Sequence, residues 1–311
     1  MAYIFANNPI SMTNSWIYYG DVLETTSSSL VIRDGLNTAF YTGSGFVYDG
    51  LYVVGGTLFG YEEYYDGDLT VRVELQISAA LVDDYMFGND FAGLSRIILA
   101  GNDDIVGSTG NDTLLGFAGS DVFVENGGYN IIDGGSGVDY LDVYGSSNQY
   151  QLTFLNDFIR VDRFDGSLEN DLYSVERVVF DNGTLALDYD GNAGQGYRIY
   201  QAAFDRTPDT AGLDYWVNQI DNGVSILQVA AGFVQSAEFR SVYGSNPSDA
   251  DFIDKLYENV LGREGETGGF NYWFDQMQQG ASRAYVLASF SESRENVLGV
   301  LPEIENGIWL G

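Results

Sequence analysis

Five aspartate or asparagine residues recur every nine positions in the middle of the chain, in a stretch without a basic residue. Written from Ile98 to Asp142, the repeats are ILAGNDDIV, GSTGNDTLL, GFAGSDVFV, ENGGYNIID and GGSGVDYLD. Position six holds Asp103, Asp112, Asp121, Asn130 and Asp139. The stretch contains eight acidic residues, so stacked repeats would crowd unpaired carboxylates together. A dication with oxygen ligands would relieve this repulsion, and calcium tolerates irregular coordination better than magnesium.

Two further columns of the repeat indicate the elements that would position these side chains. Glycine at position four permits a tight turn through the first six residues, because it tolerates positive φ and close backbone approach. The last three residues alternate in polarity and predict a short strand whose position-eight side chain points inward. The glycines are Gly101, Gly110, Gly119, Gly128 and Gly137. The position-eight residues are Ile105, Leu114, Phe123, Ile132 and Leu141.

The pattern resembles the nonapeptide GGxGxDxUx of the RTX (repeats-in-toxin) family, which binds calcium. The resemblance implies a parallel β-roll in which each nonapeptide forms half a coil, so that ions lie between repeats n and n+2. Asp103, Asp121 and Asp139 would then line one edge, here named the first edge. Asp112 and Asn130 would line the second edge. With the five position-four glycines, these residues form the predicted calcium site. A glycine-rich array of β-turns without metal is the alternative.

Departures from the pattern lower the affinity expected of the second edge. Ile98 and Glu125 stand where their repeats should begin with glycine, and Asn130 replaces an aspartate. We therefore expect two or three calcium ions. One lies between repeats one and three, one between three and five, and a weaker one between two and four.

Residues 143–190 are expected to form a β cap over the last repeat. Two stretches alternate like strands, and two more flank the hairpin signal Asp-Asn-Gly at 181–183. In chain order these are Gln149–Leu155, Phe158–Phe164, Arg177–Phe180 and Thr184–Leu187. The segment resembles the one that commonly follows RTX repeats in proteins of type I secretion. A cap would cover the exposed edge of the last repeat.

Residues 191–311 are expected to be helical and to contain two related units. YQAAFDRTPDTAGLDYW from Tyr200 matches YENVLGREGETGGFNYW from Tyr257, an offset of 57 residues. Each unit predicts an apolar helix, a turn with arginine and glycine, a helix carrying Tyr-Trp, a glycine stop and a third helix. The unit resembles an uncharacterised, phycobilisome-linker-like domain that often follows RTX repeats. Its Tyr-Trp pairs and its arginines, Arg206 and Arg263, are interpreted as core and turn residues, with a ligand or partner groove as the alternative.

Residues 1–97 are expected to be rich in β-structure, as solenoid coils leading into the roll or, alternatively, as a sandwich. Val71–Ile77 alternates strictly and predicts a strand. The region is dense in aromatic residues: Trp16, Tyr18, Tyr19, Tyr41, Tyr48, Tyr52, Tyr61, Tyr64 and Tyr65. An exposed row of rings could stack on sugars, but core and strand-face positions are favoured. The whole chain is thus predicted as a multidomain β + α protein, divided at 97/98, 142/143 and 190/191.

Composition excludes several catalytic classes. The chain has no histidine and no cysteine, which excludes Ser-His-Asp and Cys-His triads, HExxH zinc hydrolases and thiolate chemistry. The acidic pairs Glu62-Glu63, Asp66/Asp68 and Asp83-Asp84 could supply the two carboxylates of glycoside hydrolysis. Neighbours on a strand point to opposite faces, however. We expect no catalytic residues and no enzyme.

Charge and targeting signals indicate an extracellular protein. The formal net charge is −32, which argues against a nucleic-acid partner. No cleaved N-terminal signal is expected, and no apolar run approaches the ~18 residues of a membrane span. The tail Val297–Gly311 is similar in kind to the C-terminal export signals of type I substrates. We expect a secreted calcium-binding protein with a structural, adhesive or self-assembling, surface-layer-like role. Its partners would be calcium and either copies of itself or a cell-surface glycan. A glycan-binding module or polysaccharide hydrolase or lyase is the alternative.

Overall fold

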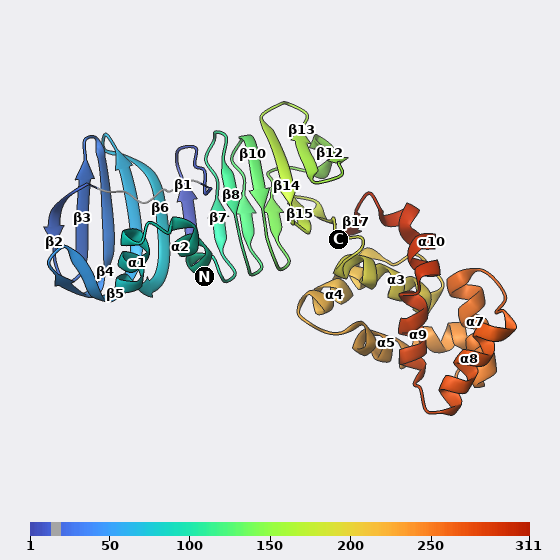
Figure 1. Ribbon diagram of the computed structural model, residues 1–311. Coiled ribbons are helices and arrows are strands. Elements are labelled where there is room, and N and C mark those ends of the chain that lie inside the picture. Colours follow the sequence, from blue (N-terminus) through green and yellow to red (C-terminus); the bar gives the residue numbers. More distant parts are fainter. Residues whose placement is uncertain (14–19) are drawn as a thin grey trace. The chain divides into compact units, whose positions relative to one another are not determined.

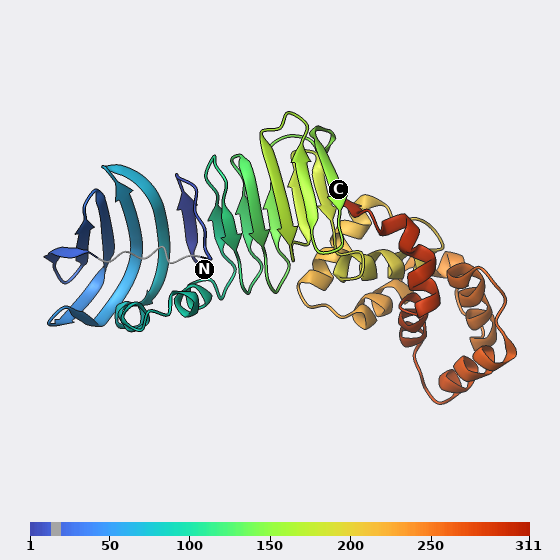
Figure 2. The ribbon, with the colours of Figure 1, turned by 45° about the horizontal axis from the view of Figure 1, so that its top comes forward.

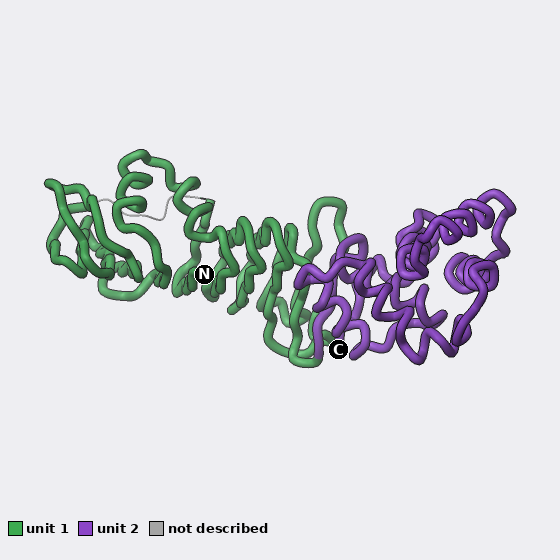
Figure 3. The backbone as a smooth tube through the Cα atoms, turned by 90° about the horizontal axis from the view of Figure 1, so that it is seen from below, with its two compact units in different colours: residues 1–182 green, residues 183–311 purple. Residues whose placement is uncertain are grey.

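The computed structural model describes residues 1–13 and 20–311. The chain divides into two compact units, residues 1–182 and residues 183–311, which are described separately (Figure 3). The second unit begins eight residues before the helical region expected from residue 191. Trp16, Tyr18 and Tyr19 of the aromatic set lie outside the described residues.

The N-terminal region of unit 1 is an antiparallel meander, so the expectation of a solenoid or sandwich is wrong. Its strands are β2 (Asp21–Thr25), β3 (Ser29–Asp34), β4 (Asn37–Asp49), β5 (Tyr52–Tyr65) and β6 (Asp68–Ser78), each antiparallel to the next. The physical reason lies in three Asp-Gly turns, whose glycines Gly35, Gly50 and Gly67 all have positive φ. Asp-Gly between alternating strands favours hairpins. The strand predicted at Val71–Ile77 is confirmed within β6.

Two helices that the sequence patterns did not predict follow the meander. They are α1 (Ala79–Phe87) and α2 (Phe91–Ile98), which begin at the N-cap residues Ser78 and Asp90. Helix α1 packs on β5 and β6 (Figures 1 and 2). Because α2 ends at Ile98, the first repeat starts from a helix end, which accounts for the missing glycine at its first position.

The nonapeptide repeats alternate between two ladders of parallel strands (Figure 1). The first ladder contains β7 (Asp104–Val106), β9 (Val122–Val124), β11 (Tyr140–Asp142) and β15 (Arg177–Phe180). The second contains β8 (Thr113–Leu115), β10 (Gly128–Asp133) and β14 (Leu168–Tyr173). All five position-eight side chains are fully buried. Each repeat therefore stacks on the repeat two before it, and the apolar column fills the space between the ladders.

The first residues of the chain join the two parts of unit 1. Strand β1 (Tyr3–Ala6) pairs in parallel with β7 and antiparallel with β6. Further on, Met12 N donates to Thr113 O and Thr113 N donates to Ile10 O, both at 2.9 Å. Residues 1–12 therefore run along the first repeat of each ladder.

The flank after the repeats forms three antiparallel strands. A 3₁₀ turn (Ser147–Gln149) leads into β12 (Tyr150–Phe154), which pairs with β13 (Ile159–Arg163), and β13 pairs with β14. Strands are thus found within both stretches predicted from alternation. Through β14, this sheet continues the second ladder.

Unit 2 contains eight helices and one strand pair. The helices are α3 (Asn192–Phe204), α4 (Thr210–Asp221), α5 (Ile226–Val234), α6 (Ala237–Tyr243), α7 (Asp249–Leu261), α8 (Thr267–Gln278), α9 (Arg283–Ser291) and α10 (Arg294–Ile304). Each of the first four begins 57 residues before its counterpart in the second four. A fourth helix, α6 or α10, follows the three that the sequence predicted.

The end of the chain is part of the core of unit 2. Strand β17 (Ile308–Leu310) pairs antiparallel with β16 (Gly183–Ala186). Ile304, Ile308 and Leu310 are buried in a cluster with residues of α3 and α4. Within 1–13 and 20–311, no helix is both long and apolar enough to cross a bilayer.

Candidate metal centre

A continuous chain of hydrogen bonds links the aspartates of the first edge. Asp103 N donates to Asp121 Oδ1, and Asp121 N donates to Asp139 Oδ1, each at 2.8 Å. The chain continues at both ends, because Ala2 N donates to Asp103 Oδ1 and Asp139 N donates to Glu176 Oε2 at 2.8 Å. One oxygen of each carboxylate therefore holds the neighbouring coil in register.

The second oxygen of each of these aspartates is buried. The Oδ2 atoms of Asp103, Asp121 and Asp139 accept no hydrogen bond from any residue that the structure describes. The three residues are at most 1% exposed. A buried charged oxygen without a partner is costly, and such atoms in folded proteins usually have a hydrogen bond or a bound ion.

Only glycine fits at position one beside the Oδ2 atoms of Asp121 and Asp139. A Cβ on Gly116 would collide with Asp121 Oδ2 and would lie 2.5 Å from the carbonyl oxygen of Gly134. A Cβ on Gly134 would lie 2.6 Å from Asp139 Oδ2 and would collide with the carbonyl oxygen of Ser174. A carboxylate oxygen and a peptide carbonyl oxygen therefore lie close together at each of these glycines, and these are the two ligand types that calcium prefers.

At each position along the first edge, the oxygen atoms come from one carboxylate and from peptide carbonyls. Over the part of the chain that the structure describes, no three acidic side chains gather around one point. The donor set of carboxylate and carbonyl oxygens fits calcium. When bound, the ion would neutralise the unpaired Oδ2 atoms, and Asp103, Asp121 and Asp139 would hold it together with carbonyls of the adjacent coils.

Burial raises the pKa of the first-edge carboxyls. The pKa of Asp121 is raised to about 6 and that of Asp139 to about 7, mainly because burial disfavours the charged form. Burial also raises the pKa of Asp103. The N–H bond to each Oδ1 acts in the opposite direction. A cation in the adjacent space would favour the ionised forms.

The second edge has a different set of contacts. Asp112 accepts hydrogen bonds from Ile10 N at 2.7 Å and from Ser108 N at 2.8 Å. Asn130 Oδ1 accepts from Asp112 N at 2.9 Å, and Asn130 Nδ2 donates to Glu125 and to Asn170. Burial, followed by the charge of Asp112, raises the pKa of Glu125 to about 8.

The position-four glycines allow the coils to stack closely. Gly119 and Gly137 have positive φ, and a Cβ on either would collide with the carbonyl oxygen of the glycine two repeats earlier, Gly101 and Gly119 respectively. Gly128 meets Gly110 in the same way. This column therefore sets the spacing between coils.

Sequence reasoning missed two residues that continue the position-six columns. Glu176 lies beyond Asp139 and Asn170 beyond Asn130, since β15 and β14 extend the ladders. An insertion separates them from the last repeat and hides the nine-residue period. A local signal was present, because each precedes by two positions a buried apolar residue, Val178 or Leu172.

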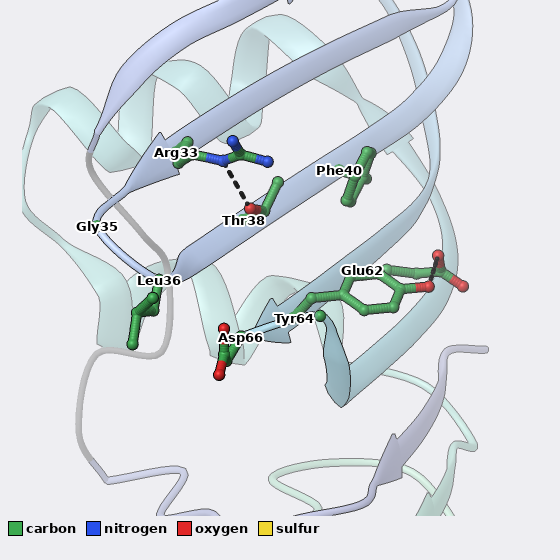
Figure 4. Close-up of a pocket in the computed structure, with 9 residues that line it drawn as sticks. Arg33, Gly35, Leu36, Thr38, Phe40, Glu62, Tyr64 and Asp66 are labelled. Carbon is green, nitrogen blue, oxygen red and sulfur yellow. Dashed lines mark hydrogen bonds between the residues drawn. The ribbon is translucent and has the colours of Figure 1, made fainter.

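The two carboxylates of the acidic pair Glu62-Glu63 in the N-terminal region have different partners. Glu62 forms an ion pair with Arg72 at 2.7 Å and accepts from Tyr64 Oη at 3.0 Å, whereas Glu63 accepts from Tyr61 Oη. These contacts place the two carboxylates on opposite faces of the sheet. Glu62 and Tyr64 line a polar hollow of about 500 Å³ beside the turns after β3 and β5, in which Arg33 Nε donates to Thr38 Oγ1 (Figure 4).

The described aromatic residues of this region are divided between core and surface. Tyr41 and Tyr61 are buried, Tyr48 and Tyr64 are half-buried, and Tyr52 and Tyr65 are exposed. The rings therefore do not share one exposed row.

The repeated arginines of unit 2 connect helices. Arg206 pairs with Glu238 and Asp209, and Arg263 pairs with the equivalent residues Glu295 and Glu266. Each guanidinium also lies over a tyrosine ring, that of Tyr200 or Tyr257. Trp216 and Trp273 are partly buried against the core, while the adjacent tyrosines are exposed.

Comparison with known proteins identifies two families in the chain. The RTX calcium-binding nonapeptide repeat (4 copies) matches residues 99–124, and a domain of unknown function (DUF4214) matches residues 197–241 and 230–299. These matches confirm the RTX resemblance and the presence of an uncharacterised domain after it. RTX nonapeptide repeats bind calcium and indicate a protein of type I secretion. Neither description names a catalytic activity.

A solved structure is similar to a small part of the chain. The extracellular lipase LipA from Serratia marcescens is similar at 29% identity with a TM-score of 0.25. The similar region covers 26% of this chain and 13% of the lipase. No curated protein matches the chain.

Proposed function

We propose that this protein is a secreted, calcium-completed protein with a structural, adhesive or self-assembling role outside the cell. In this proposal the two parallel ladders are a β-roll, and calcium binds along its first edge. The observation that carries the proposal is the column of buried, unpaired Oδ2 atoms of Asp103, Asp121 and Asp139. Its position beside peptide carbonyl oxygens of the adjacent coils supports calcium over a metal-free array of turns.

Calcium binding would make folding of the repeats depend on whether the protein is inside or outside the cell. Extracellular calcium modules have dissociation constants of ~10⁻⁴–10⁻³ M, so the ion would be bound outside the cell and absent from the cytosol. Because an unfolded chain has no preformed site, the binding free energy becomes folding free energy. The net charge of −32 would add to repulsion in the calcium-free chain.

The sheet edge at β2 supports self-assembly. Among the residues that the structure describes, strand β2 is the last strand of its sheet, and all five of its residues are exposed, including Val22 and Leu23. An open strand edge can pair with a strand of another molecule. A second copy is the partner we propose, with calcium required to order unit 1 first.

Assembly in calcium tests this function. Purified protein in millimolar calcium should form sheets, filaments or larger particles in electron micrographs and in light scattering, and chelator should reverse this. Val22→Pro on the exposed edge should reduce assembly while calcium binding persists, because proline removes a strand N–H. Protein that stays monomeric in calcium and depolymerises a polysaccharide would instead support the hydrolase or lyase alternative.

A further inference from the structure

The fourth repeat departs from the pattern at two positions, and the two departing side chains touch. Glu125 stands at position one, where repeats two, three and five begin with glycine, and Asn130 stands at position six. Asn130 Nδ2 donates to Glu125 Oε2 at 2.5 Å. Both residues are fully buried. The substitutions therefore form one contact inside the roll.

Asn130 keeps one role of the aspartate and reverses the other. Its Oδ1 accepts from Asp112 N at 2.9 Å, which reproduces the bond between Asp103 N and Asp121 Oδ1 on the first edge. Its second polar atom is an N–H donor, at the place where Asp121 presents an unpaired oxygen. A donor repels a cation, so this atom cannot replace the missing ligand.

Asp112 is satisfied by protein donors. Ser108 donates from its backbone N at 2.8 Å and from its hydroxyl at 3.0 Å to Oδ2, and Ile10 N donates to Oδ1. The equivalent residue of the first edge, Asp121, has an unpaired Oδ2. Asp112 thus lacks the unsatisfied oxygen that marks the calcium positions.

The Glu125 carboxylate also lies beside Asp112. A Cβ on Gly107 would lie 3.2 Å from Asp112 Oδ2 and 3.3 Å from Glu125 Oε1. On the first edge, the corresponding neighbour of Gly116 is a peptide carbonyl oxygen of the coil two repeats later, that of Gly134. The Glu125 side chain therefore enters the corresponding position from that coil. Asn130 Nδ2 also donates to Asn170 Oδ1 at 2.8 Å, which extends the hydrogen-bonded contact to β14.

We propose that the second edge holds no calcium ion, because the Glu125–Asn130 pair replaces the ion and its aspartate. This inference rests on the proposed calcium binding at the first edge. In this proposal only the first edge of the roll depends on calcium. The side chains of Glu125 and Asn130 close the second edge. Glu125 Oε1 accepts no hydrogen bond within the described residues, so it is the atom through which an ion would have to bind if the proposal were wrong.

The experiment counts the calcium ions bound by the full chain, using calorimetry and native mass spectrometry. Glu125→Gln keeps the shape and removes the carboxylate, so the calcium count should equal that of the wild type. Loss of one ion in this variant would overturn the proposal. Asp121→Asn, the matched change on the first edge, should lower the count and shows that single ions are resolved.

A gain of binding completes the test. The double variant Glu125→Gly, Asn130→Asp recreates the first-edge pattern on the second edge and should bind one more ion than the wild type. A folded double variant with an unchanged count would contradict the proposal, and if it does not fold, Glu125→Gln decides alone. Failure of calcium binding at the first edge, on which this inference rests, is distinguishable, because the wild type would then bind no calcium, and failure of the proposed assembly is distinguishable because the wild type would bind calcium and stay monomeric.

Discussion

Each first-edge aspartate uses its two oxygens for different purposes. Oδ1 accepts a backbone N–H, from the coil two repeats earlier for Asp121 and Asp139 and from Ala2 for Asp103, and Oδ2 faces the proposed ion. The position-six column and its preference for aspartate could be predicted from the repeat. The division between the oxygens could not, because it depends on the stacking distance between coils. Glu176 was missed for the same reason, since it enters the column only through strand pairing.

Without calcium, the stability of the repeats should fall as pH rises. The pKa of Asp121 is about 6 and that of Asp139 about 7 in the folded protein, above the ordinary value of 3.8. Raised carboxyl pKa values contribute stability that is present below about pH 4 and lost as pH rises through about 6–7. Urea unfolding in chelator should show a lower midpoint at pH 7.5 than at pH 5.

Two comparisons isolate the cause of this pH dependence. Saturating calcium should reduce or reverse the fall, because the ion binds the deprotonated carboxylates. Asp121→Asn combined with Asp139→Asn should flatten the profile in chelator. A midpoint in chelator that rises between pH 5 and pH 7.5 would contradict the assignment.

Among the helices and strands, those of the nonapeptide repeats were predicted best, because a single period determines their sequence. Position-eight residues are buried as expected, and the strands coincide with the last residues of each repeat. The meander was not predicted, although its three Asp-Gly turns favour hairpins between neighbouring strands. Helices α1 and α2 are short and lie between β-rich segments, so helical periodicity had few residues in which to appear.

The position-one glycines offer a matched pair of substitutions. Gly116→Ala should remove one calcium ion, because its Cβ would enter the space between Asp121 Oδ2 and the Gly134 carbonyl. Gly107→Ala should leave the calcium count unchanged, because the nearest atoms lie at 3.2 Å or more and no ion is proposed there. Calorimetric titration of both folded variants checks this. Equal losses in the two variants would show that the edges are alike.

The strand pair β16–β17 predicts where the helical fragment must begin. A fragment of residues 183–311 should keep the same helical circular dichroism in calcium and in chelator, since apolar clusters form most of its core and arginine–glutamate ion pairs link its helices at the surface. A fragment of residues 191–311 lacks β16 and the buried Ala186. Its melting temperature should be lower by about 5 °C or more. Unfolding of the longer fragment in chelator would contradict calcium independence.

For the whole molecule, two kinds of internal repetition give two different fold types. The nine-residue period builds stacked coils whose strands pair with the coils on either side, whereas the 57-residue offset relates two sets of helices around an apolar core. Both periods are visible in the sequence. The role of the ends of the chain was not predictable, because β1 and β17 are short strands whose partners lie about a hundred residues away.

The tail of the chain is buried in the core of unit 2. Folding of unit 2 would therefore compete with binding of the tail by an exporter. Residues 297–311 were expected to carry the export signal, yet Val300, Ile304, Ile308 and Leu310 are core residues. If these residues carry the export signal, a transporter would bind them as an extended peptide only before unit 2 folds, and secretion would depend on the folding rate. Deleting the tail would remove the expected signal together with part of the core. It would therefore not separate the effect on export from the effect on folding.

A destabilising change away from the tail does separate them. Leu213→Ala in the same core costs about 2–5 kcal/mol and leaves the tail sequence intact. It should raise the exported fraction of the protein that is synthesised, with exposed Leu227→Ala as the control. An exported fraction that falls or stays constant would show that the tail is read in its folded form. In the expected case, a more stable unit 2 would leave a larger fraction of the protein inside the cell.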